Sequence, residues 1–307
     1  MNGLQDYMVR EYVWDYREGR LSRRDLIRRV LLITGSASAT AALLGGLGLP
    51  QVAAAAPLAQ ATSPLSVPPN APTIDAQDIA FEGNGTTLLA YQARPQSASG
   101  PLPLVLVCHQ NRGLNEHIRD VVRRYAQAGY LASGLDLLSR QGGTATVTDP
   151  NQFAALLTGP DVDPTQFVGD FQAAVAYYQS QPTLARPDRV GMNGFCFGGG
   201  VVWRSVEAIP ELVAAVPFYG AAPPLDQAAN VNAAVLGVYS SDPNDFANAR
   251  RGELDQALTN AGVVHQFNVY PDTHHAFNDD TGPAYNQTQA LAAWKDTLAW
   301  FNQYLNS

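Results

Sequence analysis

From Ile74 to the end of the chain, strand-like and helix-like stretches alternate, and this alternation constrains the fold more than any other feature. A hairpin pattern, "IAFEGNGTTLLAYQAR" with Asn84-Gly85 at its turn, comes first. The apolar run "PLVLVCHQ" follows, and such a run is typical of a strand covered on both faces. Four further strand patterns follow, and each of them comes after a helix pattern. This alternation predicts an α/β fold with a mainly parallel, doubly wound sheet that is preceded by an N-terminal antiparallel hairpin.

Several reactive residues follow predicted strands directly, and the carboxyl ends of parallel strands lie along one edge of a sheet. Cys196 follows "DRVGMNGF", Asp242 follows "AVLGVYSS", and His275 follows the strand that begins "HQFNVY". The loop "HQNRG", residues 109–113, follows "LVLVC". The order nucleophile, acid, histidine is the order found in α/β-hydrolases.

Cys196 lies in "GFCFG", where Gly194 and Gly198 permit a sharp turn from strand to helix. A thiol at a helix N-terminus has a lowered pKa, because the helix dipole favours the thiolate. The alternative is that Cys196 is a small buried residue filling a tight turn. We expect the other cysteine, Cys108, to be a core residue and both cysteines to be free.

His275 is expected to accept the thiol proton, and Asp242 to orient the imidazole. The stretch "SSDPND" also offers Asp245 as the acid. The backbone amide of Phe197 and one from residues 110–111, for which we take Asn111, are expected to stabilise the oxyanion. His109 is interpreted as a structural hydrogen-bonding residue. No pair of ligands has the spacing of a zinc site, so no metal is predicted.

Three stretches together resemble the dienelactone hydrolase (carboxymethylenebutenolidase) family over roughly residues 75–305: "HQNRGLNEHIRDVVRRYAQAGYLASGLDLLSRQGG", "VGMNGFCFGGG" and "YPDTHHAFNDDTGPAYN". The resemblance implies an α/β-hydrolase fold and a triad of Cys196, His275 and Asp242. It also implies a carboxylic ester hydrolase that cleaves a lactone or ester through an acyl-thiol intermediate. It implies no cofactor.

Two positions depart from the family pattern. Gln110 stands where the family has a glutamate that helps to form the thiolate, and a glutamine cannot accept the thiol proton. Asp279 stands where well-studied members have an arginine for a substrate carboxylate, although Arg112 is a possible replacement. We therefore expect a neutral ester or lactone as substrate. A thioesterase or acyl transferase on the same site, and a weakened homologue that only binds a ligand, are the alternatives.

Residues 1–56 have the layout of an export signal, with a basic region, a long uncharged stretch and the small residues "AAAA" before Pro57, which predicts cleavage between Ala56 and Pro57 or slightly earlier. Arg23 and Arg24 in "SRRDLI" resemble the twin-arginine motif, which predicts the twin-arginine export machinery as a partner and a periplasmic or extracellular location. An uncleaved membrane anchor is the alternative. Residues 4–20 predict a short amphipathic helix, which we interpret as part of a long basic region. Residues 57–73 predict a linker and residues 74–307 the hydrolase domain.

The charge distribution argues against nucleic-acid binding. The net charge of the chain is −8, and Lys295 is its only lysine. Residues 1–56 hold seven arginines and five acidic residues, a net of +2, so the remainder carries −8 − 2 = −10. An acidic body repels phosphate backbones. A small-molecule substrate is the expected partner, and the oligomeric state is not predicted.

Overall fold

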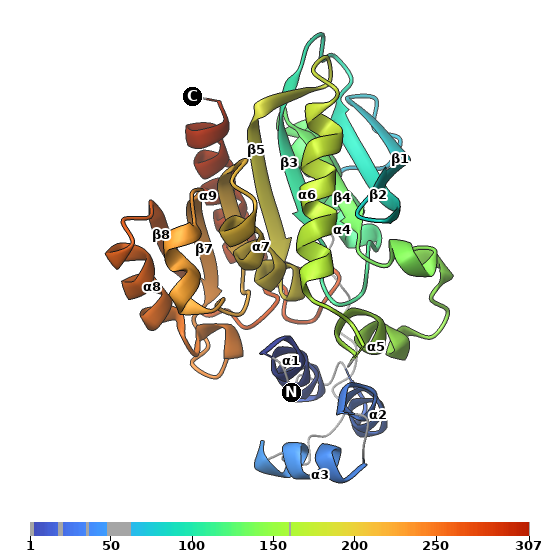
Figure 1. Ribbon diagram of the computed structural model, residues 1–307, viewed down its shortest axis with the longest axis vertical. Coiled ribbons are helices and arrows are strands. Elements are labelled where there is room, and N and C mark those ends of the chain that lie inside the picture. Colours follow the sequence, from blue (N-terminus) through green and yellow to red (C-terminus); the bar gives the residue numbers. More distant parts are fainter. Residues whose placement is uncertain (1–2, 18–20, 35–36, 48–62, 160, 307) are drawn as a thin grey trace.

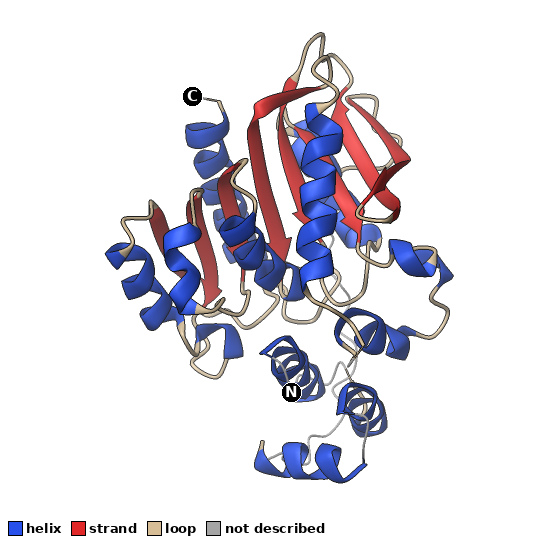
Figure 2. Cartoon of the chain, viewed as in Figure 1, coloured by secondary structure: helices blue, strands red, loops and turns tan. Residues whose placement is uncertain are grey.

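The computed structural model describes residues 3–17, 21–34, 37–47, 63–159 and 161–306, and these residues form an eight-stranded sheet flanked by helices (Figure 1, Figure 2). The strand order is β1-β2-β4-β3-β5-β6-β7-β8. The strands are β1 (Ile74–Gly83), β2 (Thr86–Pro95), β3 (Leu102–Cys108), β4 (Leu131–Asp136), β5 (Ala185–Phe195), β6 (Leu212–Phe218), β7 (Ala234–Ser240) and β8 (His265–Tyr270).

The predicted mixture of antiparallel and parallel pairing is confirmed. β1 pairs with β2, and β2 with β4, in antiparallel fashion, whereas every pairing from β4 through β3 to β8 is parallel. Asn84 and Gly85 form the hairpin turn with positive φ values of 49° and 74°. Two residues at positive φ match the right-handed twist of the strands that they join, which is why Asn-Gly selects this turn.

Helices cover both faces of the sheet, as the doubly wound prediction requires. α4 (Glu116–Gln127) and α9 (Gln287–Leu305) lie behind the sheet in Figure 1, whereas α6 (Thr165–Gln179), α7 (Phe197–Ala208) and α8 (Arg251–Asn260) lie in front. Because both faces are covered, the side chains of β3 from Pro103 to Cys108 are all buried. The parallel strands place their carboxyl ends at the lower edge of the sheet in Figure 1.

Helix boundaries follow local capping groups. The Asn115 side chain accepts a hydrogen bond from the amide of Ile118 (3.2 Å) and starts α4. α9 begins at Gln287, because the Asn286 side chain caps the amide of Gln289 (3.2 Å). Short helices that the pattern did not predict fill the loops: α5 (Phe153–Thr158), η1 (Ser139–Gln141), η2 (Thr144–Thr146), η3 (Pro150–Gln152), η4 (Leu225–Asn230) and η5 (Phe246–Asn248).

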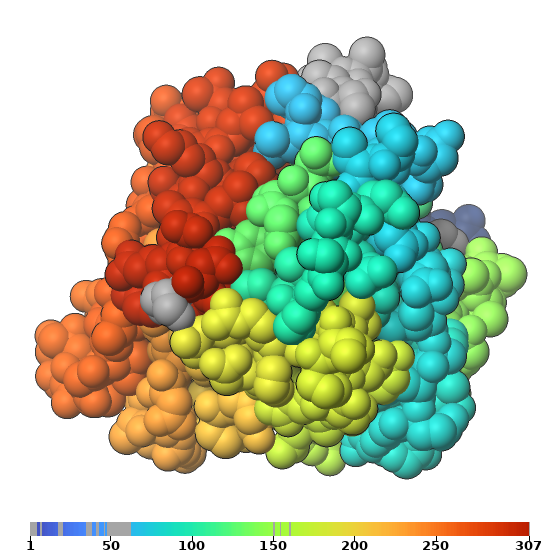
Figure 3. Space-filling model, turned by 90° about the horizontal axis from the view of Figure 1, so that it is seen from above, coloured from blue at the N-terminus to red at the C-terminus, as the bar shows by residue number. Residues whose placement is uncertain are grey.

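The N-terminal segment forms three further helices, α1 (Gly3–Arg17), α2 (Arg23–Thr34) and α3 (Ala37–Gly46). They lie beyond the carboxyl ends of the strands, next to α5 (Figure 1). Seen from the opposite end of the molecule, the body hides most of them (Figure 3). None of the helices in the described ranges combines the length and the apolar character that crossing a bilayer requires.

The segment predicted as a linker is described only from Ser63 onward, and the predicted cleavage point between Ala56 and Pro57 lies outside the described residues. Residues 63–72 form turns. Val67 is fixed to α4, since its amide donates to Asp120 (2.7 Å) and its carbonyl accepts from Arg123 (2.6 Å).

Candidate active site

Cys196 lies at the turn between β5 and α7, with φ 59° and ψ −118°. This conformation is unusual for a residue with a side chain, and such backbone strain occurs mainly at functional turns. The Cys196 amide donates to the carbonyl of Phe218 (3.0 Å), and the Gly200 amide donates to the carbonyl of Cys196 (3.1 Å). The turn is therefore held by the neighbouring strand on one side and by its own helix on the other.

A glycine is required directly after this turn. A Cβ atom on Gly198 would lie 2.5 Å from the carbonyl oxygens of both Cys108 and His109, at the end of β3. Both partners are backbone atoms, so the clash cannot be relieved by a rotamer change. The close approach brings the N-terminus of α7 against the loop that carries Gln110 and Asn111.

The structure brings Cys196 and His275 together. The Nε2 atom of His275 lies 3.2 Å from the Sγ atom of Cys196, and both residues are buried. The Nδ1 atom of His275 lies 3.0 Å from Oδ1 of Asp245. A thiol, an imidazole and a carboxylate are thus joined by two consecutive hydrogen bonds.

Asp245 is kept ionised by its surroundings. Burial opposes the charge, but the nearby His275 and three hydrogen bonds lower the pKa of Asp245 below its ordinary value. These hydrogen bonds come from His275, from the Ser240 hydroxyl (2.5 Å) and from the Ala247 amide (3.0 Å). An ionised carboxylate at Nδ1 holds the imidazole with its other nitrogen directed at the thiol.

The expectation that Asp242 pairs with His275 is wrong. Asp242 instead contacts the neighbouring His274, whose Nδ1 lies 2.8 Å from Oδ2 and whose side chain is 56% exposed. After β7 the chain makes a turn in which the Asp245 amide donates to the carbonyl of Asp242 (3.1 Å). This turn directs the carboxylate of Asp245 inward, against Ser240, and leaves Asp242 beside the exposed ring.

The loop after β3 supplies polar groups on the other side of the thiol. Gln110 and Asn111 are buried, and their Nε2 and Nδ2 atoms have no hydrogen-bond partner among the described residues. Both residues line the same small cavity as Cys196, whereas Arg112 lines it from an exposed position. His109 is structural, as predicted: its Nε2 accepts from the Leu137 amide (3.1 Å), and its Nδ1 contacts the Gln110 carbonyl (2.6 Å).

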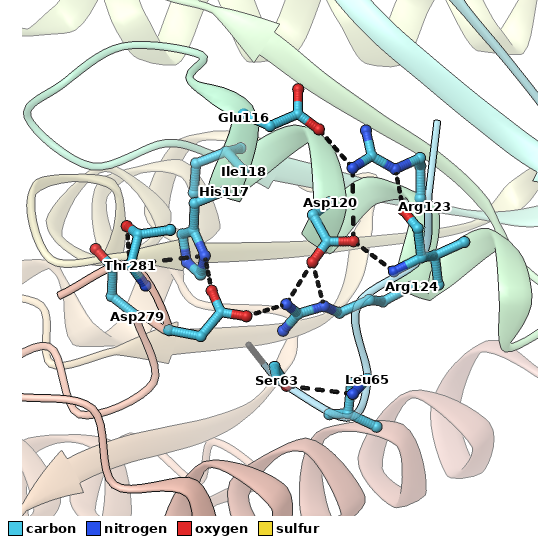
Figure 4. Close-up of polar contacts among 12 residues, drawn as sticks. Ser63, Leu65, Glu116, His117, Ile118, Asp120, Arg123, Arg124, Asp279 and Thr281 are labelled. Carbon is cyan, nitrogen blue, oxygen red and sulfur yellow. Dashed lines mark hydrogen bonds and ion pairs between the residues drawn. The ribbon is translucent and has the colours of Figure 1, made fainter. Parts of the chain in front are cut away.

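The loop that follows His275 is fixed by a buried network of charged residues on α4 (Figure 4). Asp280 accepts from His117 (2.7 Å) and from Arg124 (2.6 Å), and Arg124 also pairs with Asp120. The hydrogen bond and the charges of His117 and Arg124 outweigh the effect of burial and lower the pKa of Asp280 to about 2. Asp279 lines the cavity beside Cys196, so a carboxylate does stand where a substrate anion would approach.

The sequence analysis missed the contribution of α1. Glu11 is buried, a carboxyl oxygen of Glu11 lies within 4.8 Å of the Sγ atom of Cys196, and Asp15 lines the cavity one helical turn later. The ring of Trp14 lies 6.5 Å from that of His275, centroid to centroid. The local signal for this role is the pair of acidic residues, Glu11 and Asp15, embedded in the aromatic stretch "REYVWDYR".

Two clusters among the described residues hold three ligand-type atoms within 4.8 Å of one another: Glu11, Cys196 and His275, and His117, Asp279 and Asp280. In the first, the hydrogen bond between Cys196 and His275 accounts for the contact of the thiol with the imidazole. In the second, Arg124 already neutralises Asp280. Neither cluster therefore supports a metal assignment.

Comparison with known proteins places the chain. A model described as the dienelactone hydrolase family matches residues 88–305. The chain belongs to this family. It is 36% identical over 235 residues to a candidate carboxymethylenebutenolidase of Escherichia coli (strain K12), covering 72% of this chain and 84% of that protein. It is 35% identical to one of Salmonella typhi, covering 81% of this chain and 95% of that protein.

Solved structures support the same family assignment. The chain superimposes on a candidate dienelactone hydrolase from Klebsiella pneumoniae subsp. pneumoniae MGH 78578 with a TM-score of 0.69 and 34% identity. The match covers 75% of this chain and 99% of that one. A dienelactone hydrolase-like promiscuous phosphotriesterase from metagenomic libraries shares the fold, with a TM-score of 0.67 at 23% identity. Like these relatives, the chain is a dienelactone hydrolase-like hydrolase with the α/β-hydrolase fold.

Proposed function

We propose that this member of the dienelactone hydrolase family cleaves a small, neutral ester or lactone, with Cys196 as nucleophile. The observation that carries the proposal is the hydrogen-bonded series from Cys196 through His275 to Asp245. His275 is the general base, and Asp245 orients it and stabilises its cationic form.

The reaction has two stages. In the first, His275 accepts the thiol proton while the sulfur attacks the carbonyl carbon, and the carbonyl electrons move to oxygen. We assign the backbone amides of Phe197 and Asn111 to the stabilisation of this oxyanion, and the side-chain amides of Gln110 and Asn111, which line the cavity and have no partner among the described residues, are further donors. Collapse of the tetrahedral intermediate breaks the ester C–O bond, and His275 returns the proton to the departing alkoxide, which leaves an acyl-thiol enzyme.

In the second stage, His275 takes a proton from water, and the resulting hydroxide attacks the thioester carbonyl. Collapse releases the carboxylic acid and restores the thiol. In a lactone, the alcohol and the acid remain parts of one product molecule.

The acidic lining of the cavity supports a neutral substrate. Burial opposes the charge of Asp279, but His117, Thr281 and Arg112 lower the pKa of this carboxyl below its ordinary value, so it is ionised near neutral pH. A substrate carboxylate at this position would meet a like charge. Arg112 lies at the same cavity and already faces Asp279, Asp15 and Glu11.

The test is hydrolysis of a short-chain aryl ester, with intact-protein mass spectrometry to trap the acyl enzyme. Substitution Cys196→Ala is expected to lower kcat by at least about 10⁴-fold and to remove the acyl adduct. Asn193→Ala is unsuitable as a control, because the Asn193 side chain supports the strand through the carbonyl of Val216 (2.7 Å). Arg189→Ala, near the far end of the same strand, is the matched control. Undiminished turnover by the Cys196 variant would contradict the proposal.

We also propose export by a twin-arginine route. Arg23 and Arg24 begin α2, and both are exposed, as recognition by export machinery requires. Replacing both arginines by lysine is expected to retain the protein in the cytoplasm of the producing cell. Equal amounts of the wild-type and the doubly substituted protein in the exported fraction would refute the twin-arginine route.

A further inference from the structure

Helix α1 is buried on nearly every side although it lies outside the family match, which begins at residue 88. Its apolar side chains Met8, Val9, Tyr12, Val13, Trp14 and Tyr16 are each at most 9% exposed. Among its described side chains, Arg10 alone is exposed. The helix contacts α2, α5 and η5, and η5 carries Phe246, whose ring lies 4.6 Å from that of His275.

With α1 in place, the cavity beside Cys196 measures about 20 Å³. A single water needs about 10–15 Å³ by the same kind of measure, so the cavity has room for about one water. Even the smallest ester has several heavy atoms. Cys196 and His275 are 1% and 2% exposed. The closed form therefore excludes any ester from the thiol.

α1 does more than cover the cavity, because one of its side chains reaches the sulfur. A carboxyl oxygen of Glu11, the Sγ atom of Cys196 and a ring nitrogen of His275 lie within 4.8 Å of one another, and all three residues line the same cavity. An ester that is to be attacked must put its own carbonyl group at this position. Glu11 and a substrate thus compete for the same place.

The same helix separates the small cavity from a larger one. Asp6 and Arg10 line a groove of about 410 Å³ together with Phe246 and residues of the loops after β6 and β7. Glu11 and Asp15 line the small cavity. Since α1 forms a wall of both, its departure would connect the groove to Cys196 and provide the volume that a substrate needs.

Polar contacts from α2 fix this segment to the loop before α5, since Arg28 donates to Asp149 (2.8 Å) and Arg29 to Asn151 (3.0 Å). Within the segment, Arg17 of α1 donates to the carbonyl of Leu47 (2.8 Å). Covalently, residues 3–47 join the body only through residues 48–62. One cut in that stretch, such as the one expected after Ala56, would free them.

We propose that the described residues 3–17, 21–34 and 37–47, the N-terminal cover, act as an intramolecular ligand of the active-site cleft. The full-length chain is then a latent enzyme, and it gains activity when the cover leaves. The latency rests on the proposed hydrolase function, whereas the covering of Cys196 does not depend on it. A single segment would then direct export and keep the enzyme closed until it is removed.

Alkylation of Cys196 by iodoacetamide tests access independently of catalysis. In the full-length protein the thiol should react slowly, because a covered thiol reacts only through a rare open form. Tyr12→Asp puts a charge at a site that is 1% exposed and should accelerate alkylation by at least about tenfold. The matched control is Arg10→Ala, on the exposed side of the same helix. The chain has a second free, buried cysteine, Cys108, and loss of the label in Cys196→Ser shows that Cys196 is the alkylated residue.

A second form of the experiment leaves every residue of α1 unchanged. A site for a specific protease is inserted within residues 57–62 of the full-length chain, and the protein is cut and diluted. The cut protein should alkylate and hydrolyse the aryl ester faster than the uncut one. A synthetic peptide of residues 1–20 should lower both the alkylation rate and the ester turnover of the cut protein again. Circular dichroism of the cut protein checks that it remains folded.

The outcomes distinguish the two proposals. Faster alkylation without ester hydrolysis supports the cover and overturns the hydrolase. Equal alkylation rates before and after cutting, or in Tyr12→Asp and wild type, overturn the cover whatever the activity. A fall in ester turnover on cutting, with alkylation accelerated, also overturns it as an inhibitor, because Glu11 would then be assisting the reaction.

Discussion

Replacing Glu11 by glutamine should tighten the closed form at alkaline pH. Burial, followed by the charge of Asp15, raises the pKa of Glu11 from 4.5 to about 7, against the opposing influence of His275, Arg112 and the hydrogen bond with Cys196. This change corresponds to about 3.5 kcal/mol at about 1.4 kcal/mol per pH unit. That amount is the penalty for keeping an ionised Glu11 in the closed form.

The pH dependence follows from the direction of the change. Below pH 4.5, Glu11 is protonated whether the cover is open or closed, so it contributes no pH dependence. Between pH 4.5 and about 7, the open form releases a proton that the closed form keeps, and closure weakens as the pH rises. Above about 7 the full penalty applies. The wild-type cover should therefore open more readily at pH 8 than at pH 5.

Glutamine has nearly the same shape and no charge, so Glu11→Gln removes the penalty. Hydrogen exchange of the α1 amides measures the result, after correction for the intrinsic pH dependence of exchange. At pH 8 the variant should be protected up to about 300-fold more than wild type, and at pH 5 the two should differ by only about fourfold. Asp6→Asn is the matched control, since Asp6 lies on the same helix and pairs with Arg10 at the surface.

The reasoning is refuted if α1 in Glu11→Gln loses protection between pH 5 and pH 8 as steeply as in wild type. The same holds if Asp6→Asn reproduces the effect of Glu11→Gln, because a general change of helix charge would then explain it.

Three further predictions concern the site. Asp245→Asn should lower ester kcat by roughly 10³–10⁴-fold because the imidazole loses its orienting charge, whereas Asp242→Asn should change kcat less than threefold; the opposite ranking in a steady-state assay would restore Asp242 to the triad. Gly198→Ala should lower the unfolding free energy by more than about 2 kcal/mol, measured by urea denaturation, since its Cβ would lie 2.5 Å from the Cys108 carbonyl oxygen; wild-type stability would show that the elbow can shift. Gln110→Ala should reduce kcat by about 10–100-fold with little change in KM, as expected for a donor used in the transition state; a rise in KM alone would assign it to substrate binding.

The elements of the fold follow from local pattern. A strand with both faces covered must be apolar throughout, as in "PLVLVC", and Asn84-Gly85 can adopt the positive φ angles of a hairpin turn. The cysteine between Gly194 and Gly198 marks the elbow, because the geometry of the turn depends on neighbours within a few residues. The parallel arrangement then places Cys196 and His275 at one edge, which is why both could be named in advance.

The sequence alone determined the strands and main helices of the body and the candidate pair Cys196 and His275, because periodicity, turn chemistry and the succession of elements along the chain are local properties. Tertiary structure alone decided between Asp242 and Asp245, three residues apart in one turn, since only packing against Ser240 selects the carboxylate that faces inward. It alone brought Glu11 to Cys196, 185 positions away (196 − 11). Which distant surfaces meet depends on the shape and burial of the assembled molecule, and no local period encodes that.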